Sequence, residues 1–170
     1  MDKFSCKKNT DLESFLKNLS IRFEHTGKSR TYLCYDEKSL KQGHLKIIAY
    51  FSVALKVLRL PEDMSKNQRR KLDGFSSNLH GELISVLPVF LIGQLARDDN
   101  YPKEIINGAE ILKWALFLIK KAHDYVGGRL IVVDVKTSEN KLIDFYQRNG
   151  FTKIFDDKKT ELSSMIYILQ

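Results

Sequence analysis

The sequence predicts a mixed α/β fold, in which one curved sheet has helices on both faces. Three observations predict it. The run Leu130–Val135 is apolar and mostly β-branched, as in a strand buried on both faces. Helical patterns precede and follow this run, as in strands joined by covering helices. A length of 170 residues with 43% apolar content suits a single domain over 1–170 with its own core.

The first third of the chain predicts a helix followed by a β-hairpin. Thr10 and Glu13 have the spacing of a capping box, and apolar residues then recur at helical intervals. We therefore expect a helix over about residues 11–24. The segments Arg30–Tyr35 and Lys46–Leu55 are rich in apolar, aromatic and β-branched residues, and they predict the two strands of the hairpin.

The middle of the chain is expected to be less regular. Residues 36–44 are polar and predict the turn of the hairpin. The segment Lys56–Leu83 contains Pro61 and a strongly charged stretch, so it predicts an excursion with one short helix, too small for a core of its own. Apolar residues then predict a strand over Val86–Ala96, with Pro88 near its start or at a bulge.

The last third predicts two further helices and three strands. An apolar stripe of period 3.6 runs through residues 111–126, and the pair Gly127–Gly128 ends this helix. After the buried strand, Ser138 is expected to open a second helix. Strands at Phe151–Phe155 and Ser164–Leu169 complete the sheet. The predicted order is helix, two strands, excursion, strand, helix, strand, helix and two strands.

The net charge is +7, from 28 basic and 21 acidic residues. A basic surface favours encounters with polyanions such as RNA, acidic proteins or coenzyme A. It can equally serve solubility alone. The densest basic run is Lys66–Lys71, which has no interleaved aromatic residue and no known nucleic-acid-binding motif. Within it, Arg69, Arg70 and Lys71 are the residues expected to contact an RNA partner.

Other compositional features exclude several classes of protein. No stretch approaches the roughly 18 apolar residues of a membrane-spanning helix. The first residues also lack the apolar run of a signal peptide, so we expect a cytoplasmic protein with no membrane contact. Two cysteines, Cys6 and Cys34, make neither a disulfide framework nor a metal set, and Cys34 is expected to be a reduced core thiol.

Two segments resemble the acyl-CoA-binding half of the GNAT superfamily of N-acetyltransferases. They are Leu91–Ala96 and Lys141–Phe151, and the second contains Phe145-Tyr146 and Gly150-Phe151, which look like the family's signature. The resemblance covers most of the chain. It implies the GNAT fold, an N-acetyltransferase that uses acetyl-CoA as acetyl donor, and no metal.

The resemblance also implies roles for individual residues. The backbone of Gln94, Leu95 and Ala96 would hold the pantetheine arm and polarise the thioester carbonyl. Tyr146 would return a proton to the departing thiolate as general acid. The alternative for Tyr146 is a core aromatic beside Phe145. Asn140, near the start of the last helix, either bonds the pantetheine or simply lies near the helix cap.

The phosphate-binding loop departs from the family pattern. That pattern has Gln or Arg, two residues, Gly, one residue, and Gly or Ala, and neither glycine is in register here. A loop rebuilt around an asparagine that tolerates a left-handed conformation, followed by a glycine, can still approach a phosphate. The alternative is that coenzyme binding is lost and the chain is a non-catalytic binding module. The cofactor-binding residues expected in this loop are Lys103, Ile106, Asn107, Gly108 and Ala109.

The front of the chain is similar to the GNAT branch of toxin–antitoxin systems, which acetylates the amino group of aminoacyl-tRNA and blocks translation. The similar pieces are Asp11–Leu16, Gly27–Tyr32 and Ala49–Ser52. This resemblance implies an aminoacyl-tRNA acceptor, an antitoxin partner and a homodimer. A small-molecule or protein amine remains open as the acceptor.

Three further sets of residues are candidates for a general base, a core position or a zinc site. Asp134 lies in the most apolar strand, as either a general base or a structural hydrogen-bond acceptor. An α-amino group has a reference pKa of roughly 7.7–8.0, so no strong base is required. Trp114 is expected in the core. The histidines lack zinc-ligand spacing, and they are His25, His44, His80 and His123.

Overall fold

The computed structural model describes residues 4–169, which form two compact units. The first unit takes the residues up to Ala54 together with Ile92–Lys121, and the second takes Leu55–Leu91 and the residues from Ala122 onward. Two long strands, β2 (Ile47–Arg59) and β5 (Val86–Arg97), contribute to both. The expectation of a single domain stays a prediction.

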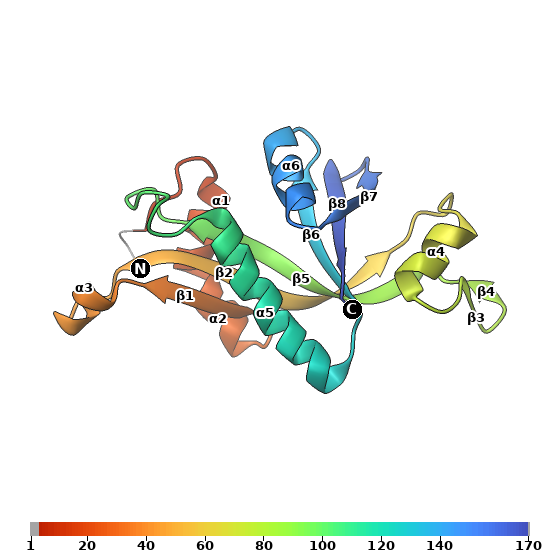
Figure 1. Cartoon of the computed structure of the whole chain (residues 1–170), viewed down its shortest axis with the longest axis horizontal. Helices are drawn as coiled ribbons and strands as arrows, with labels where there is room; N and C mark the ends of the chain where they lie inside the picture. The colour runs from red at the N-terminus through yellow and green to blue at the C-terminus, as the bar shows by residue number, and fades with distance from the viewer. Residues whose placement is uncertain (1–3, 170) are drawn as a thin grey trace. The chain divides into compact units, whose positions relative to one another are not determined.

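The predicted fold class is confirmed. The main sheet has the strand order β1-β2-β5-β6-β8-β7, is mostly antiparallel, and is flanked by helices (Figure 1). The expected helices and strands follow one another in the predicted order, with one additional helix between the first two strands and a short hairpin in the excursion. Pro88 lies near the start of β5, where a missing backbone donor is tolerated.

The first helical segment differs from the expected helix at its start. It begins with α1 (Thr10–Ser14), and Asn9, not Thr10, is its cap: Asn9 Oδ1 accepts a hydrogen bond of 3.1 Å from Asp11 N. The predicted capping box is wrong, because the residue before Thr10 has the extended backbone that a cap requires. Glu13 instead accepts a hydrogen bond from Cys6 N.

This segment also contains a π-helical turn, η1 (Phe15–Leu19), before α2 (Ser20–His25). Ser20 N donates to Phe15 O, five residues back, and Ser20 Oγ donates to Leu16 O at 2.6 Å. The rings of Phe15 and Phe23 lie edge to face, 5.6 Å apart. Residues eight apart differ by roughly 80° around a regular helix. The extra residue of the π turn reduces this to about 20°, so both rings reach the same core.

The hairpin of β1 (Arg30–Tyr35) and β2 is confirmed as an antiparallel pair. Its connection is not the simple turn expected over 36–44, because it contains a helix, α3 (Glu37–Lys41). Asp36 caps this helix by accepting hydrogen bonds from Lys38 N and Ser39 N. The strand β2 also extends four residues beyond its predicted end at Leu55, to Arg59.

The core of the first unit lies under the helices of its N-terminal segment. Tyr50 is fully buried there, donates to Leu12 O at 2.6 Å, and has its pKa raised by burial. Helix α5 (Gly108–Val126) buries Ile111, Leu112, Ala115 and Ile119. The core residues are Phe4, Cys6, Phe15, Leu16, Ile47, Tyr50 and Ala96.

The excursion in the second unit is more ordered than expected. It holds α4 (Lys66–Asp73) and a short hairpin of β3 (Asn78–Leu79) and β4 (Glu82–Leu83). A complete capping box starts α4: Ser65 Oγ accepts from Gln68 N, and Gln68 Oε1 accepts from Ser65 N.

The sheet of the second unit places β6 (Leu130–Lys136) next to β5, in parallel, and next to β8 (Leu162–Ile168), antiparallel. The edge strand β7 (Thr152–Asp157) pairs with β8. Helix α6 (Asn140–Arg148) lies beside these strands (Figure 1). The core residues of this unit are Leu58, Leu60, Met64, Leu72, Ile84, Leu87, Val89, Leu130, Val132 and Ile166.

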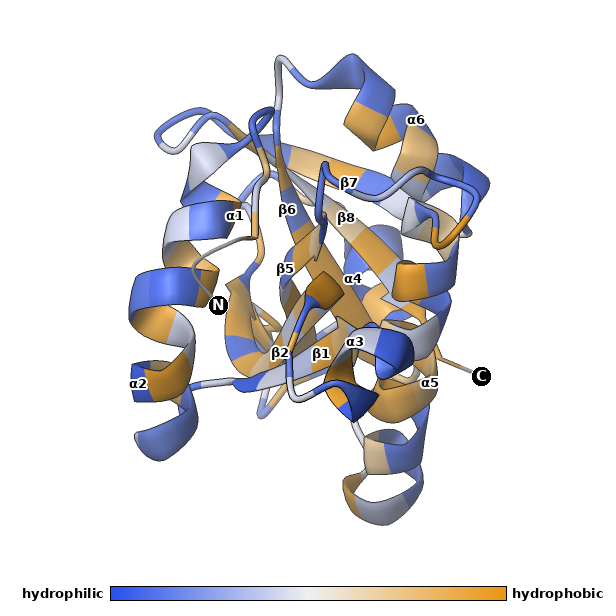
Figure 2. Ribbon diagram, turned by 90° about the vertical axis from the view of Figure 1, so that its left-hand side faces the viewer, coloured by the Kyte–Doolittle hydropathy of each residue, from blue (hydrophilic) through white to orange (hydrophobic). Residues whose placement is uncertain are grey.

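Surface and core segregate as expected of a packed α/β protein. Hydrophobic and hydrophilic residues alternate around α2 and α5 (Figure 2). Cys6 is buried and Cys34 half-buried, both are free thiols, and burial raises the pKa of each. Across residues 4–169, no helix combines the length and the apolar character that crossing a membrane requires.

Candidate functional site

The predicted site residues are divided between the two units. Gln94–Ala96, Lys103 and Ile106–Ala109 belong to the first unit, whereas Asn140 and Tyr146 belong to the second.

The start of α5 is closed by a reciprocal pair of side-chain caps. Asn107 Oδ1 accepts hydrogen bonds from Ala109 N at 3.0 Å and Glu110 N at 3.1 Å. Glu110 Oε2 in turn accepts from Asn107 N at 2.8 Å. Three amides at this helix start are therefore already bonded, and a carboxylate lies among them.

This geometry corrects the expected conformation of Asn107. Among the non-glycine residues that the structure describes, only His80 and Glu161 have positive φ, so Asn107 is a helix cap and not a left-handed residue. Gly108 is the first residue of α5. Lys103 is exposed in the turn before the helix, and Ile106 is half-buried. A phosphate can reach the amides of Ala109 and Glu110 once the side chain of Asn107 turns away.

The end of β5 presents the other predicted part of the first unit. Gln94 and Leu95 are half-buried, and Ala96 is 4% exposed and packs in the first core. Small residues here keep the strand backbone accessible, and Gly93, just before Gln94, is exposed. The family resemblance implies that the backbone of these residues holds a pantetheine arm.

Tyr146 lies on α6 in an aromatic cluster. Its ring packs edge to face against Phe145 at 5.1 Å and Phe151 at 5.3 Å between centroids, and Phe151 contacts Tyr167. The side chain is 7% exposed, and burial raises the pKa of Tyr146 to about 12. Phe145 is only half-buried.

Asn140 is the first residue of α6 and is exposed. The helix starts two residues later than Ser138, which was expected to open it, because Thr137 and Ser138 form a turn after β6. Glu139 occupies the cap position without a side-chain hydrogen bond. In contrast to α5, the start of α6 keeps its first amides free of side-chain caps.

The carboxylate of Asp134 is held by two side-chain partners. Lys56 Nζ donates to its Oδ2, and Ser164 Oγ donates to its Oδ1 at 3.1 Å. Both carboxylate oxygens are engaged, so of the two roles left open for Asp134 the geometry favours the structural one.

The basic run contains one residue whose expected role is wrong. Arg69 is 2% exposed, and its guanidinium donates to the backbone carbonyls of Pro61, Glu62, Met64 and Ile84. It holds the excursion together and is not available to RNA. In the sequence, Arg69 is simply part of a charged run, and such runs are ordinarily exposed to solvent. The sequence therefore did not predict that this side chain is buried.

A groove of about 1030 Å³ in the first unit was not foreseen. Its polar lining includes Asp36, His44, Lys46, Asp98 and Tyr101, which come from separate segments without a recognisable motif. Asp98 is 4% exposed. The pKa of Tyr101 is raised by burial and by the nearby carboxylates of Asp36 and Asp98. The groove thus brings acidic and basic side chains of the first unit together.

Among residues 4–169, no group of three or more His, Cys, Asp or Glu side chains is placed to hold a metal ion. His123 Nδ1 lies 2.6 Å from Gly128 O, a structural contact at the end of α5.

The fold is that of GNAT acetyltransferases, as comparison with solved structures shows. A tyrosine-to-phenylalanine mutant of KacT superposes with a TM-score of 0.72 at 20% identity, over 97% of this chain and 85% of that one. AtaT complexed with acetyl-methionyl-tRNAfMet superposes with the same score at 18% identity, over 98% and 86%. AtaTR bound with AcCoA matches at 0.72 and 17%, over 98% and 84%. No family sequence model and no curated protein sequence matches the chain.

Proposed function

We propose that this protein transfers the acetyl group of acetyl-CoA to a primary amine, and that the amine is the one of an aminoacyl-tRNA. The observation that carries the proposal is the fold, which agrees over 98% of the chain with AtaT solved with acetyl-methionyl-tRNAfMet and with AtaTR bound with AcCoA. The aromatic cluster around Tyr146, on the helix where the family resemblance places the catalytic tyrosine, supports it.

The proposed chemistry is a direct transfer. The neutral amine attacks the thioester carbonyl, a C–N bond forms, and the C–S bond breaks as the tetrahedral intermediate collapses. The amine nitrogen loses a proton to water, and the hydroxyl of Tyr146 donates a proton to the departing sulfur before water replaces it. Because burial raises the pKa of Tyr146 to about 12, the hydroxyl stays protonated wherever the amine is neutral.

The other predicted residues have binding roles in this proposal. The backbone of Gln94, Leu95 and Ala96 lines the pantetheine arm. The start of α5 at Gly108, with the amides of Ala109 and Glu110, receives the pyrophosphate, and Lys103 in the preceding turn adds positive charge. The uncapped start of α6 at Asn140 offers a further hydrogen-bonding group. Binding of the phosphates requires the Asn107–Glu110 caps to open.

The self-capped start of α5 also favours a second candidate, a GNAT-fold binding module without catalysis. Three bonded amides and the Glu110 carboxylate oppose a phosphate there. Calorimetric titration with acetyl-CoA separates the two candidates. Binding in the micromolar range supports the enzyme, whereas no heat at millimolar acetyl-CoA leaves the binding module.

The acceptor is tested by incubating the protein with labelled acetyl-CoA and a set of charged tRNAs. We expect acetylated amino acid after the ester bond is hydrolysed, and none with the Tyr146→Phe variant. Free amino acids, polyamines and peptides serve as competing acceptors in the same assay. Transfer to one of these but not to charged tRNA would reassign the acceptor and keep the enzyme class.

An antitoxin partner and a homodimer belong to the same proposal. A neighbour, an AtaT mutant toxin, was solved bound to the C-terminus of the antitoxin AtaR. If this chain acts likewise, its induced expression should arrest growth, and Tyr146→Phe should relieve the arrest. Normal growth with the intact protein, and no acetylated aminoacyl-tRNA in the cells, would remove the toxin role.

A further inference from the structure

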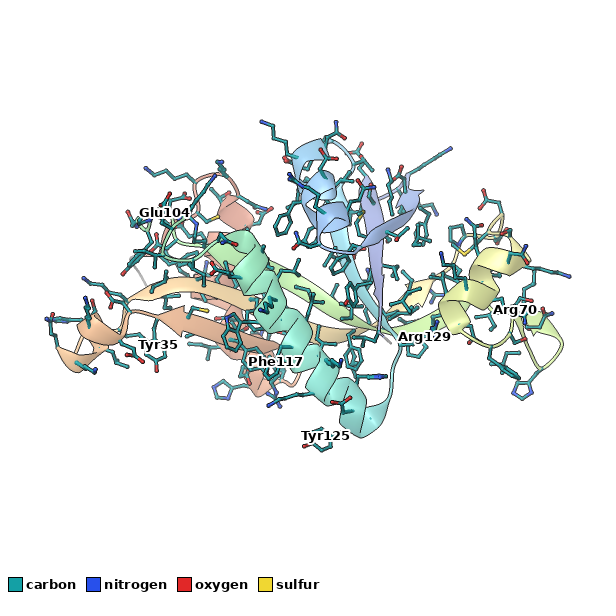
Figure 3. All side chains as sticks on the ribbon, viewed as in Figure 1. Tyr35, Arg70, Glu104, Phe117, Tyr125 and Arg129 are labelled. Carbon is teal, nitrogen blue, oxygen red and sulfur yellow. The ribbon has the colours of Figure 1, made fainter. Side chains whose placement is uncertain are left out.

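Helix α5 has an exposed face that combines aromatic rings with lysines. We call it the lysine–aromatic face, and its members are Lys113, Trp114, Phe117, Lys120 and Lys121, all exposed. Spacings of three, four and seven residues place them on one side of the helix. The opposite side packs into the core through Ile111, Ala115 and Ile119. Phe117 is labelled on this helix in Figure 3.

Both rings of this face are exposed to solvent. Trp114 is 55% exposed and Phe117 is 48% exposed. This differs from the sequence-based expectation that Trp114, on the long helix, lies in the core. Their rings lie edge to face with centroids 6.1 Å apart. Apolar surface that is left in water without a local partner marks a surface used in binding.

The lysines decide which partner fits this face. Lys121 Nζ lies 4.7 Å from the centroid of the Phe117 ring, so one positive charge is held directly at an aromatic surface. Lysines are depleted from the centres of protein–protein interfaces. Two copies of this face would also bring three lysines against three, in a chain of net charge +7.

We propose that the lysine–aromatic face binds single-stranded RNA, with bases stacking on Trp114 and Phe117 and phosphates lying near Lys113, Lys120 and Lys121. Aromatic rings within a basic surface are the recurrent platform for unpaired nucleotides, since every base has a face to stack. The inference builds on the proposed tRNA acceptor, which has an unpaired 3′ end. The test measures RNA binding and not acetyl transfer, so RNA binding by this face and acetyl transfer to aminoacyl-tRNA can each fail without the other.

The experiment uses the single tryptophan of the chain as a local probe. An unstructured RNA decamer, titrated at about 50 mM salt into the full-length protein, should quench the fluorescence of Trp114. Fluorescence anisotropy of the labelled decamer should report the same dissociation constant. Trp114→Phe keeps a ring and should bind within about twofold, whereas Trp114→Ala should weaken binding by roughly 5- to 100-fold, the range for loss of a stacked base.

The lysines are tested by the salt dependence of binding. Replacing Lys120 and Lys121 by glutamine should reduce the slope of log K against log salt by about 1.4, at roughly 0.7 per phosphate contact for a single strand. The matched control replaces the exposed Lys158 and Lys159 between β7 and β8, and should leave the slope unchanged.

Two results would overturn the proposal. One is decamer binding that Trp114→Ala leaves intact, or no binding at 100 μM protein. The other is tryptophan quenching that follows protein concentration without RNA, together with a dimer in sedimentation equilibrium, which would assign the face to a second copy. Circular dichroism of each variant confirms folding, which substitutions at exposed positions should preserve.

Discussion

Asn107 and Glu110 cap the first turn of α5 for each other. The asparagine carboxamide accepts from Ala109 N and Glu110 N, and the glutamate carboxylate accepts from Asn107 N. This is the arrangement of a capping box, and it stabilises the helix with the same amides that a coenzyme phosphate would need. Helix stability and phosphate binding therefore compete at this position.

Neutralising Glu110 should strengthen coenzyme binding. Glu110→Gln keeps an oxygen that can accept from Asn107 N but removes a negative charge close to the expected pyrophosphate. Repulsion on the order of 1 kcal/mol at a few ångströms in water corresponds to about fivefold in affinity. Calorimetry with acetyl-CoA measures it, with Glu37→Gln at the start of α3 as the charge-matched control. Equal affinity in both variants would place the phosphates elsewhere.

Removing one hydroxyl should separate catalysis from packing. Tyr146→Phe keeps the contacts with Phe145 and Phe151, so the melting temperature and the affinity for acetyl-CoA should change little. Turnover should fall by roughly 10²-fold or more if the hydroxyl is the general acid. Tyr125→Phe, at a side chain 86% exposed, is the control. An unchanged rate in Tyr146→Phe would assign the ring to the core alone.

The pH profile should have a rising limb and no falling limb below pH 10. The amine must be neutral, so kcat/KM rises through its pKa, roughly 7.7–8.0 for an α-amino group. The tyrosine must be protonated, and burial raises the pKa of Tyr146 to about 12, so this form persists above pH 10. Initial rates from pH 6 to 10 test this. A decline centred near pH 9, absent from Tyr146→Phe, would contradict the buried environment.

Arg69 should matter for stability and not for RNA. Arg69→Met leaves the buried carbonyls of Met64 and Ile84 without the arginine donor, and each unsatisfied buried group costs about 1–3 kcal/mol. We expect the free energy of unfolding to fall by at least about 2 kcal/mol in urea denaturation. Arg70→Met, at the exposed neighbour labelled in Figure 3, should change it by under about 0.5 kcal/mol. Similar losses in both variants would contradict the packing.

A pair of glycines after α5 provides a steric test. Gly127 and Gly128 both have positive φ, but a Cβ on Gly127 would meet no atom within 4 Å, whereas one on Gly128 would lie 2.8 Å from the Phe90 ring. Gly127→Ala should cost only the conformational penalty, about 1 kcal/mol. Gly128→Ala should cost clearly more, as measured by thermal unfolding. Equal costs would show that the Phe90 ring moves aside freely.

Periodicity was enough to predict the fold, because burial on one helix face or on both strand faces leaves a local pattern. The stripe of α5 and the run Leu130–Val135 both appear where they were expected. Local capping was predictable only in part. The spacing of Asn107 and Glu110 is itself a capping signature, and it falls in the residues that the family resemblance assigns to the phosphate loop.

The remaining differences depend on tertiary contacts. The burial of Arg69 requires four carbonyls from two segments, residues 61–64 and Ile84, to converge on its guanidinium. These acceptors lie outside Lys66–Lys71, so the basic run alone does not predict them. Trp114 is a large, mostly apolar residue, which predicts burial, yet it lies on the exposed side of α5. Residues that form binding surfaces are exceptions to the rule that large apolar side chains are buried, so a prediction based on that rule places them in the core.

The π turn at Phe15–Leu19 has an evolutionary consequence. The turn contains one residue more than a regular helical turn would. The contact between the rings of Phe15 and Phe23 depends on this extra residue. Deleting a single residue within the turn would restore a regular helix while keeping both rings about 20° apart. A deletion between this turn and Phe23 would rotate one ring away from the other. Among relatives of this chain, length changes in the first helix should therefore concentrate at this turn.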